Sequence, residues 1–406
     1  MLNQTHIDIV KTTAPLVEQH AREITEHFYP LMFERYPLVK NYFNLTHQNN
    51  GAQRQALANA VVAYAKHIDR LQVITPAVEL IVQKHVSLNI LPEHYPIVGE
   101  CLLESIGVIL GDAVTPAVAE AWTLAYQQLA ELMIGKEKDL YHYHEQRIGG
   151  WRGEKTFVVA AKVKESEVIT SFYLEPVEAV QLIDFEAGQF TCVVTTIEGQ
   201  PVRRNYSLSD APGKRTLRIS VKRENGGLVS NYLHDHVEVG HRLNLTAPSG
   251  NFTLQHSERP LILVTGGVGI TPAISMLNSC IHSGRQVHFI HAAINEYHHA
   301  FSDHINELKA LHRNLHTTTI YSDKNSSGEC DYRGFITKDI IAEQLPDNKD
   351  VDFYYLGPLP FMKSVNRITR DLEIPSHQVH YEFFGPLQQL EDENTQKDQQ
   401  PELAES

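Results

Sequence analysis

The first part of the chain repeats apolar side chains at helical spacing. An apolar position every three to four residues is typical of helices that bury one face. The stretches with this pattern are 53–68, 76–86, 95–110 and 116–141. They predict an all-α domain over residues 1–146.

The pattern changes at Arg147, where several glycines interrupt it. Short runs rich in β-branched and aromatic residues follow, separated by turns, which is typical of strands in a small barrel or sandwich. These runs are 156–162, 168–174, 190–196 and 216–223. They predict a β domain over residues 147–257.

A third pattern begins at Pro260. Apolar runs at 261–265, 287–291 and 353–356 alternate with helical stretches. This alternation predicts an α/β domain with a parallel sheet over residues 258–387. The chain is therefore predicted to be multidomain, with an α domain, a β domain and an α/β domain in series.

Composition narrows the classes of function. The 406 residues carry a formal net charge of −14, which argues against binding to nucleic acid or to an anionic membrane. Part of this charge lies in residues 388–406, a polar segment with six acidic residues and one lysine, which predicts an acidic disordered tail.

No stretch contains the roughly 18 consecutive apolar residues of a membrane span, and the N-terminus lacks the apolar run of a signal peptide. The four cysteines have no CxxC spacing and predict reduced thiols, so we expect a cytoplasmic protein. We also expect a monomer.

One of the 23 histidines lies on an apolar helix face. His85 follows Val78 by seven residues and Ile81 by four, so the three side chains share a face. Such a histidine is either a core residue bonded to a backbone carbonyl or a metal ligand. Convergence of Tyr95 and Glu137 on the imidazole would favour the ligand, because ligating histidines hydrogen-bond through their other ring nitrogen.

Aromatic residues are concentrated between positions 28 and 43. A stripe of this kind more often belongs to a core than to a cofactor site. The hydroxyl of Tyr29, however, needs a polar partner if it is buried. Gln53 stands near the start of the next predicted helix, where a solvated side chain is expected.

The β domain contains the run Arg204, Asn205, Tyr206 and Ser207 at the end of a predicted strand. A guanidinium binds phosphate, and the tyrosine and serine offer a stacking ring and a hydroxyl to an isoalloxazine. An exposed strand that carries an arginine is the alternative interpretation.

Two further features of the β domain support a cofactor site. Phe190 enters a strand after Gly188 and Gln189. Gly227 and Ser230 adjoin a helical stretch whose N-terminal amides can hold a pyrophosphate. An ordinary glycine hairpin is the alternative there.

A glycine-rich turn follows the first strand of the α/β domain. Thr271 is predicted to be the N-cap of the next helix and Pro272 its first residue, so that free amides face an anion. The turn is not a strict GxGxxG, and no acidic residue closes the strand over 287–293. A turn without a ligand is the alternative.

Three segments, HFYPLMFERYPLVKNYFN, QRQALANAVVAYA and QKHVSLNILPEHYPIVGECLL, resemble the globin domain of bacterial and yeast flavohaemoglobins, and the resemblance continues to Pro386. It implies a globin domain, an antiparallel β-barrel that binds FAD, and a parallel-sheet NAD-binding domain like that of ferredoxin reductases. The resemblance also implies the roles of the helical-domain residues: His85 is the proximal ligand of haem b, Tyr95 and Glu137 are its charge-relay partners, Tyr29 and Gln53 face the bound gas, and Lys84 with Glu382 tunes the haem and flavin potentials.

The same resemblance implies two further sets of binding residues. For FAD they are Phe190, Arg204, Asn205, Tyr206, Ser207, Gly227, Ser230, Phe383, Phe384, Gly385 and Pro386. For NADH or NADPH they are Gly267, Val268, Gly269, Ile270, Thr271, Pro272, Gly357 and Pro358. The sequence departs from the family at three positions, where Phe190 replaces a usual tyrosine and Leu356 and Phe383 replace cysteines.

The activity that the resemblance implies is nitric oxide dioxygenation, in which NAD(P)H reduces FAD, FAD reduces the haem, and O2 and NO are the substrates. The lack of a basic cluster after the strand at 287 favours NADH, because a 2′-phosphate needs arginine or lysine. A reductase of peroxides or ferric complexes, and a gas sensor or oxygen store, are the alternatives.

Overall fold

The computed structural model describes residues 2–43, 52–178 and 181–385. Contacts divide this part of the chain into two compact units. The first unit holds residues 1–163, 171–208 and 212–253, and the second holds residues 164–170, 209–211 and 254 onward.

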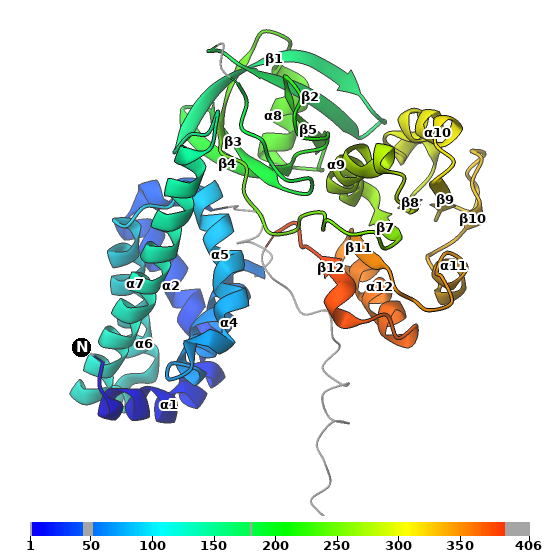
Figure 1. Ribbon diagram of the computed structural model, residues 1–406. Helices are drawn as coiled ribbons and strands as arrows, with labels where there is room; N and C mark the ends of the chain where they lie inside the picture. Colours follow the sequence, from blue (N-terminus) through cyan, green and yellow to red (C-terminus); the bar gives the residue numbers. More distant parts are fainter. Residues whose placement is uncertain (1, 44–51, 179–180, 386–406) are drawn as a thin grey trace, which may run out of the picture. The chain divides into compact units, whose positions relative to one another are not determined.

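The first unit begins with the predicted all-α domain (Figure 1). Its α-helices are α1 (Gln4–Gln19), α2 (Ala21–Arg35), α4 (Ala52–Lys66), α5 (Thr75–Ser87), α6 (His94–Leu110) and α7 (Pro116–Gln146). Local chemistry defines their ends: the Asn3 side chain accepts the His6 amide at the start of α1, and α7 begins at Pro116 behind a Thr115 cap. Helices α6 and α7 approach closely because Gly99 lacks a side chain, and a Cβ there would lie 2.4 Å from the Tyr126 ring.

The second part of the first unit is a six-stranded sheet in the order β4-β3-β6-β1-β2-β5. The strands are β1 (Glu154–Lys164), β2 (Ile169–Pro176), β3 (Phe190–Ile197), β4 (Gln200–Ser207), β5 (Leu217–Lys222) and β6 (Arg242–Thr246). An isolated antiparallel bridge between Leu208 and Ile219 joins the two ends of the sheet, so the sheet curves around a core, as predicted for a barrel. Helix α8 (Leu228–His236) buries Val229 and Leu233 in that core.

The second unit is built on a parallel sheet in the order β10-β9-β8-β7-β11-β12. The strands are β7 (Leu261–Gly266), β8 (Val287–Ala293), β9 (Leu315–Tyr321), β10 (Tyr332–Arg333), β11 (Asp352–Leu356) and β12 (Val379–Tyr381). Figure 1 shows α9 (Ile270–Cys280) and α10 (Ser302–Leu311) on one side of this sheet, and α11 (Lys338–Ala342) and α12 (Leu359–Asp371) on the other. Helices on both faces explain why the central strands β7 and β11 are buried along their whole length and mostly apolar. The predicted series of three architectures is thus confirmed.

The order of the strands reverses between β7 and β11. From β7 the chain moves outward to β8, β9 and β10, and it then returns to add β11 and β12 on the other side of β7. Parallel sheets bind ligands outside the carboxyl ends of the strands at such a switch point. The topology therefore directs attention to the loops that follow β7 and β11.

Among the described helices, none combines the length and the apolar composition that a membrane span requires.

A buried ion pair sits at the first residue of β11. The Asp352 carboxylate, with a side chain 2% exposed, pairs with Arg285, whose side chain is 6% exposed, and also with Arg259 at 3.0 Å. Removing one partner of a buried pair leaves the other charge without compensation, so Asp352→Asn is expected to lower the free energy of opening this unit by about 3 to 5 kcal/mol. Hydrogen exchange of the β7 and β11 amides measures this change.

The matched control is Lys349→Ala, which removes an exposed pair with Glu373 at 3.4 Å. Its effect is expected to stay below about 1 kcal/mol. Equal effects of the two variants would show that the buried pair contributes no more than a surface pair.

Candidate active site

In the helical domain, the structure brings three predicted residues together. His85 lies near the end of α5, Tyr95 at the start of α6 and Glu137 late in α7. The Nδ1 atom of His85 lies 2.8 Å from Glu137 Oε1 and 3.1 Å from Tyr95 Oη. Tyr95 also donates a short hydrogen bond to the same carboxylate oxygen. Because both contacts to His85 use Nδ1, Nε2 is the ring nitrogen that can bind a metal.

The partners of His85 Nδ1 are therefore not the backbone carbonyl that the alternative interpretation expects. The Nδ1 partners are a carboxylate and a phenol, the kind of partner that makes an imidazole a stronger electron donor. The His85 ring remains one-third exposed, while the Glu137 side chain is 3% exposed. A buried carboxylate with an accessible imidazole on one side fits the proximal side of a haem.

The surroundings of Tyr95 fix this group. Burial, reinforced by the Glu137 carboxylate, raises the pKa of Tyr95 well above its usual value, so the phenol keeps its proton and stays a donor. Tyr126 Oη donates to the Tyr95 carbonyl at 2.6 Å, and Tyr141 Oη donates to the Ile90 carbonyl at 2.7 Å. These bonds hold the backbone between α5 and α6.

The predicted gas-facing residues lie on α2 and α4. Tyr29 is buried, and its ring packs against those of Phe28, Phe33 and Phe43 at centroid distances of 4.8 to 5.8 Å. The aromatic stripe thus belongs to the helical core, and Tyr29 brings a hydroxyl into it. Gln53 lies in the first turn of α4, but its side chain is outside the part that the structure describes.

The two residues expected to tune the redox potentials lie in different units. Lys84 precedes His85 on α5 in the first unit. Glu382 is buried and follows β12 in the second unit.

The run from Arg204 to Ser207 forms the last half of β4, as predicted. Burial lowers the pKa of Arg204 and raises that of Tyr206. Within the described residues no carboxylate pairs with Arg204, whose Nη1 donates to the Arg203 carbonyl. A half-buried guanidinium without a carboxylate fits an external anion such as a phosphate.

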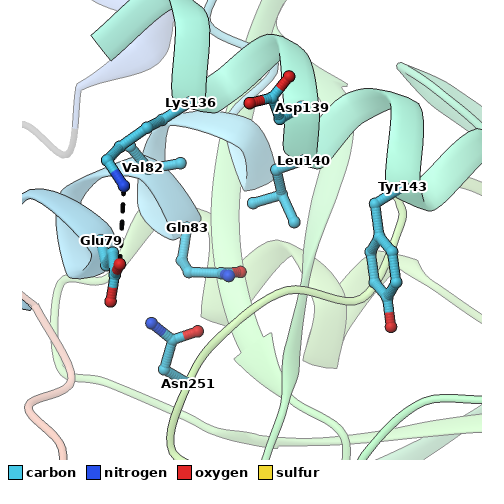
Figure 2. A pocket seen from close by; sticks show the side chains of 8 residues that line it. All are labelled: Glu79, Val82, Gln83, Lys136, Asp139, Leu140, Tyr143 and Asn251. Carbon is cyan, nitrogen blue, oxygen red and sulfur yellow. Dashed lines mark ion pairs between the residues drawn. The ribbon is translucent and has the colours of Figure 1, made fainter. Parts of the chain in front are cut away.

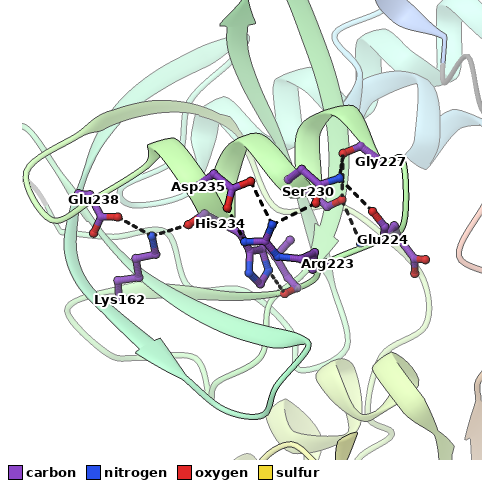
Figure 3. A network of polar contacts seen from close by, with 10 residues as sticks. Lys162, Arg223, Glu224, Gly227, Ser230, His234, Asp235 and Glu238 are labelled. Atoms are coloured by element: carbon purple, nitrogen blue, oxygen red, sulfur yellow. Dashed lines mark hydrogen bonds and ion pairs between the residues drawn. The ribbon is translucent and has the colours of Figure 1, made fainter.

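The glycine turn before α8 is built around Ser230 (Figure 3). Its hydroxyl accepts the Glu224 amide at 3.2 Å and donates to the Gly227 carbonyl at 3.4 Å. Gly227 is the N-cap of α8, and a Cβ there would lie 2.5 Å from Ser230 Oγ. Ser230 thus lies inside the first turn of the helix, where it holds the loop that exposes the N-terminal amides.

Two cationic side chains, Arg223 and Lys162, hold the rest of α8 in place. Figure 3 shows Arg223 paired with Asp235, at 2.6 Å in its shorter contact. The same figure shows Lys162 bound to the His234 carbonyl and to Glu238, each at 2.8 Å.

Phe190 begins β3 and is buried against a glycine. Its backbone exchanges two hydrogen bonds of 2.9 Å with Ser249. Gly250 has a φ of +116°, and a Cβ there would lie 2.9 Å from the Phe190 ring. The loop after β6 therefore fixes the orientation of this ring.

In the second unit, the glycine turn lies at the carboxyl end of β7. The predicted N-cap at Thr271 is wrong, because Gly267–Gly269 form a 3-10 turn, the N-cap is Gly269 and α9 already begins at Ile270. The Thr271 hydroxyl instead donates back to the Val268 carbonyl at 3.0 Å. Pro272 is correspondingly the third residue of the helix, and the free amides lie two residues earlier than expected.

The loops after β7 and β11 meet at the switch point. A Cβ on Gly269 would lie 2.2 Å from the Leu356 carbonyl oxygen and 2.9 Å from the Gly357 nitrogen. Pro358 follows as the N-cap of α12. Only glycines permit this approach, and the resulting backbone cradle fits a dinucleotide.

The C-terminal aromatic residues follow β12. Phe383 is half-buried, packs on the core of the second unit and lies 5.9 Å from the Tyr381 ring between centroids. Phe384 is exposed, and Gly385 has a φ of +139°. Pro386 lies outside the described residues.

Three residues of interest were not predicted from the sequence. Gln83 and Ser87, on α5, form hydrogen bonds to the β domain. Glu296, three residues beyond the end of β8, accepts hydrogen bonds from Ser326 and Ser327. The Ser326 bond contributes most to lowering the Glu296 pKa. A polar side chain within an apolar helix was the signal available for Gln83, whereas the Glu296 contacts join distant loops.

A cleft of about 340 Å³ lies between α5, α7 and the loop after β6 (Figure 2). It is lined by the Glu79 and Lys136 pair, whose charged atoms lie 3.6 Å apart, and by Gln83 and Asn251.

Comparison with known families identifies the three domains in the expected order. The globin family model matches residues 26–133, the oxidoreductase FAD-binding domain matches 156–254, and the oxidoreductase NAD-binding domain matches 263–367.

Comparison with individual proteins extends the similarity to nearly the whole chain. The flavohemoprotein of Burkholderia sp. (strain TH2) is 50% identical over 96% of this chain and 100% of its own length, and that of Pseudomonas aeruginosa is 48% identical over 96% and 100%. A flavohemoglobin structure from Malassezia yamatoensis, with bound FAD and heme, has a TM-score of 0.83 at 24% identity and covers 95% of this chain and 100% of that one. The FAD/NAD-binding domain of nitric oxide dioxygenase from Vibrio cholerae is 35% identical, with a TM-score of 0.53, and covers 57% of this chain and 99% of that one. The chain therefore belongs to the flavohemoprotein family.

Proposed function

We propose that this protein is a nitric oxide dioxygenase, which uses NADH to convert NO and O2 into nitrate. The observation that carries the proposal is the buried Glu137 carboxylate on Nδ1 of His85, in a globin domain joined to FAD-binding and NAD-binding domains. An oxygen store needs no such electron-donating partner, whereas activation of O2 benefits from it.

The residues described above fit three cofactors. His85 Nε2 would hold the haem iron, Arg204 and the amides before α8 would hold FAD, and the cradle of Gly269 and Gly357 would hold the nicotinamide nucleotide. When bound, each cofactor would supply one part of the chemistry: NADH a pair of electrons, the flavin their delivery one at a time, and the haem iron a site for O2 and NO.

The chain's own residues set the electronic character of the proximal site. Glu137 accepts the Nδ1 proton of His85 in its hydrogen bond and gives the ring partial imidazolate character. Tyr95 donates to the same carboxylate and keeps it oriented toward His85. Tyr126 holds the Tyr95 backbone.

The proposal assigns the oxygen substrate to Tyr29, whose buried ring packs among those of Phe28, Phe33 and Phe43. A hydrogen bond from the Tyr29 hydroxyl stabilises negative charge that develops on the oxygen substrate. The apolar rings around it limit the access of water and so strengthen that interaction.

Three finer assignments complete the proposal. NADH is preferred over NADPH, because the segment after β8 holds no lysine or arginine before α10 and carries the Glu296 carboxylate. The protein acts in the cytoplasm, which its free, mostly buried cysteines support. It acts as a monomer on O2 and NO.

The reaction itself provides the decisive test. One NO, one O2 and one electron form one nitrate ion. Because NADH supplies two electrons, one NADH is expected to support the consumption of two NO and the formation of two nitrate ions. Parallel NO-electrode, NADH-absorbance and nitrate measurements on reconstituted holoprotein check this ratio. NADH oxidation at a rate that does not depend on NO would instead identify a reductase of other acceptors. Gas binding without turnover would identify a sensor or an oxygen store.

Glu137→Gln keeps the shape of the side chain and removes its charge. Because partners of this kind typically contribute about 10- to 100-fold in activity, we expect NO dioxygenation to slow by that factor. The weaker imidazole donor should also lower the iron–histidine stretching frequency in resonance Raman spectra of the ferrous protein. Tyr64→Phe, which removes bonds to the Ala125 carbonyl and Gln128 and none to His85, Tyr95 or Glu137, is the control and should leave the frequency unchanged. An unchanged frequency in Glu137→Gln would contradict the proposed role.

Tyr29→Phe removes the hydroxyl and keeps the aromatic packing. A hydrogen bond to a charged group contributes about 1.5 to 3 kcal/mol, so O2 is expected to dissociate about 10- to 100-fold faster. Stopped-flow displacement of O2 by CO measures the rate. An unchanged dissociation rate would show that Tyr29 forms no bond to the ligand.

A further inference from the structure

Helix α5 contacts the β domain through two polar side chains that flank His85. The Gly250 amide donates to Gln83 Oε1 at 2.7 Å, and Gln83 lines the same cleft as the neighbouring Asn251 (Figure 2). Ser87 is fully buried, and its Oγ lies 3.1 Å from the Asn205 side-chain nitrogen. Its single proton is donated to the Lys84 carbonyl at 2.8 Å, so the Asn205 amide is the donor to Ser87.

The positions of these residues place them on the side of α5 opposite His85. Gln83 and Ser87 are four residues apart and share a face. His85 stands two residues from each, about 200° around the helix. One face of α5 therefore carries the proposed haem ligand, while the other bonds to the β domain.

One bond ends at a residue of the proposed flavin site, and the other ends at a residue that packs against one. Asn205 lies in β4 between Arg204 and Tyr206. Gly250 is the residue against which the Phe190 ring packs. A movement of α5 relative to either residue would therefore change the separation between His85 and the flavin-binding strands directly.

We propose that the Gln83–Gly250 and Ser87–Asn205 bonds form a clamp, the α5 clamp, that fixes the haem ligand relative to the flavin and so sets the rate of electron transfer between them. Gln83 and Ser87 are positioning residues. With both groups bound, two successive one-electron transfers from the reduced flavin would convert ferric iron to ferrous iron, with one proton released to solvent for each pair of electrons. Hydride from NADH, which becomes NAD⁺, would restore the two electrons and that proton to the flavin. The inference rests on the proposed function for the direction of electron flow, but it does not require NO as substrate.

The test uses a Gln83→Leu/Ser87→Ala double variant of the holoprotein, reduced by NADH without oxygen and under CO. Stopped-flow absorbance follows flavin bleaching and formation of the ferrous CO complex separately. Flavin reduction is expected to keep its rate, and haem reduction is expected to slow several-fold, because the electron donor and acceptor would no longer be held at a fixed separation and orientation. Hydrogen exchange should also become faster at the Gly250 amide, because its acceptor is lost.

Two further variants distinguish loss of the α5 clamp from a general disturbance of the fold. Glu79→Gln changes a residue of the same helix and the same cleft whose partner, Lys136, lies within the helical domain, and it should leave both rates unchanged. Gln83→Glu retains an acceptor for the Gly250 amide and should restore the exchange rate and most of the haem reduction rate in the Ser87→Ala background.

Haem reduction within twofold of wild type in the double variant, at normal haem and FAD content, would overturn the proposal. So would an equal slowing of flavin bleaching, since the variant would then have damaged the flavin site. If the double variant loses a cofactor, the Gln83→Leu and Ser87→Ala single variants are measured by the same two rates, because each removes one bond of the clamp. Failure of NO turnover with normal haem reduction would refute the proposed function and leave the clamp intact.

Discussion

The helical domain depends on a buried carboxylate that must find hydrogen-bond donors. Glu137 is almost inaccessible, and a buried charge without partners would destabilise the fold by several kcal/mol. Its donors come from two other helices, His85 on α5 and Tyr95 on α6. The requirement that Glu137 be satisfied therefore ties three helices together at one point. The same bonds orient the imidazole and leave Nε2 for a metal, so the stability of the core and the electronic character of the proposed ligand have a common origin.

A comparable constraint operates in the second unit, where function depends on the absence of side chains. The strand order reverses between β7 and β11, and the two following loops meet because Gly269 and Gly357 allow their backbones to approach. The amides at the start of α9 then face the crevice that every doubly wound sheet has at this point. Burial of Asp352 with Arg285 and Arg259 at the opposite end of β11 fixes the strand from which one of these loops departs. A polar network at one end and a glycine contact at the other thus define the geometry of the crevice.

Local sequence patterns predicted most elements but not all of their details. The helical period located α4 to α7 to within a few residues, since each buries one face, and the switch from period 3.6 to short β runs located the sheets. Thr271 was assigned as a cap from its residue type, yet the 3-10 turn over Gly267–Gly269 begins the helix earlier. Gln83 and Ser87 were missed because their partners lie 167 and 118 residues away, and no local pattern encodes such a pairing. Convergence of His85, Tyr95 and Glu137 was a possibility that only the folded chain could show.

Helix α5 couples the helical domain to the β domain, so the positions of the two domains are not independent. A helix has two faces, and here one carries His85 while the other holds Gln83 and Ser87 against the β domain. Packing that fixes the first face against Glu137 therefore fixes the second as well, because a helix of 13 residues moves as a rigid body. Conversely, a shift of Gly250 or Asn205 is transmitted to the imidazole without any intervening flexible segment. The position of the proposed haem ligand is thus set jointly by the core of its own domain and by the strands proposed to bind the flavin.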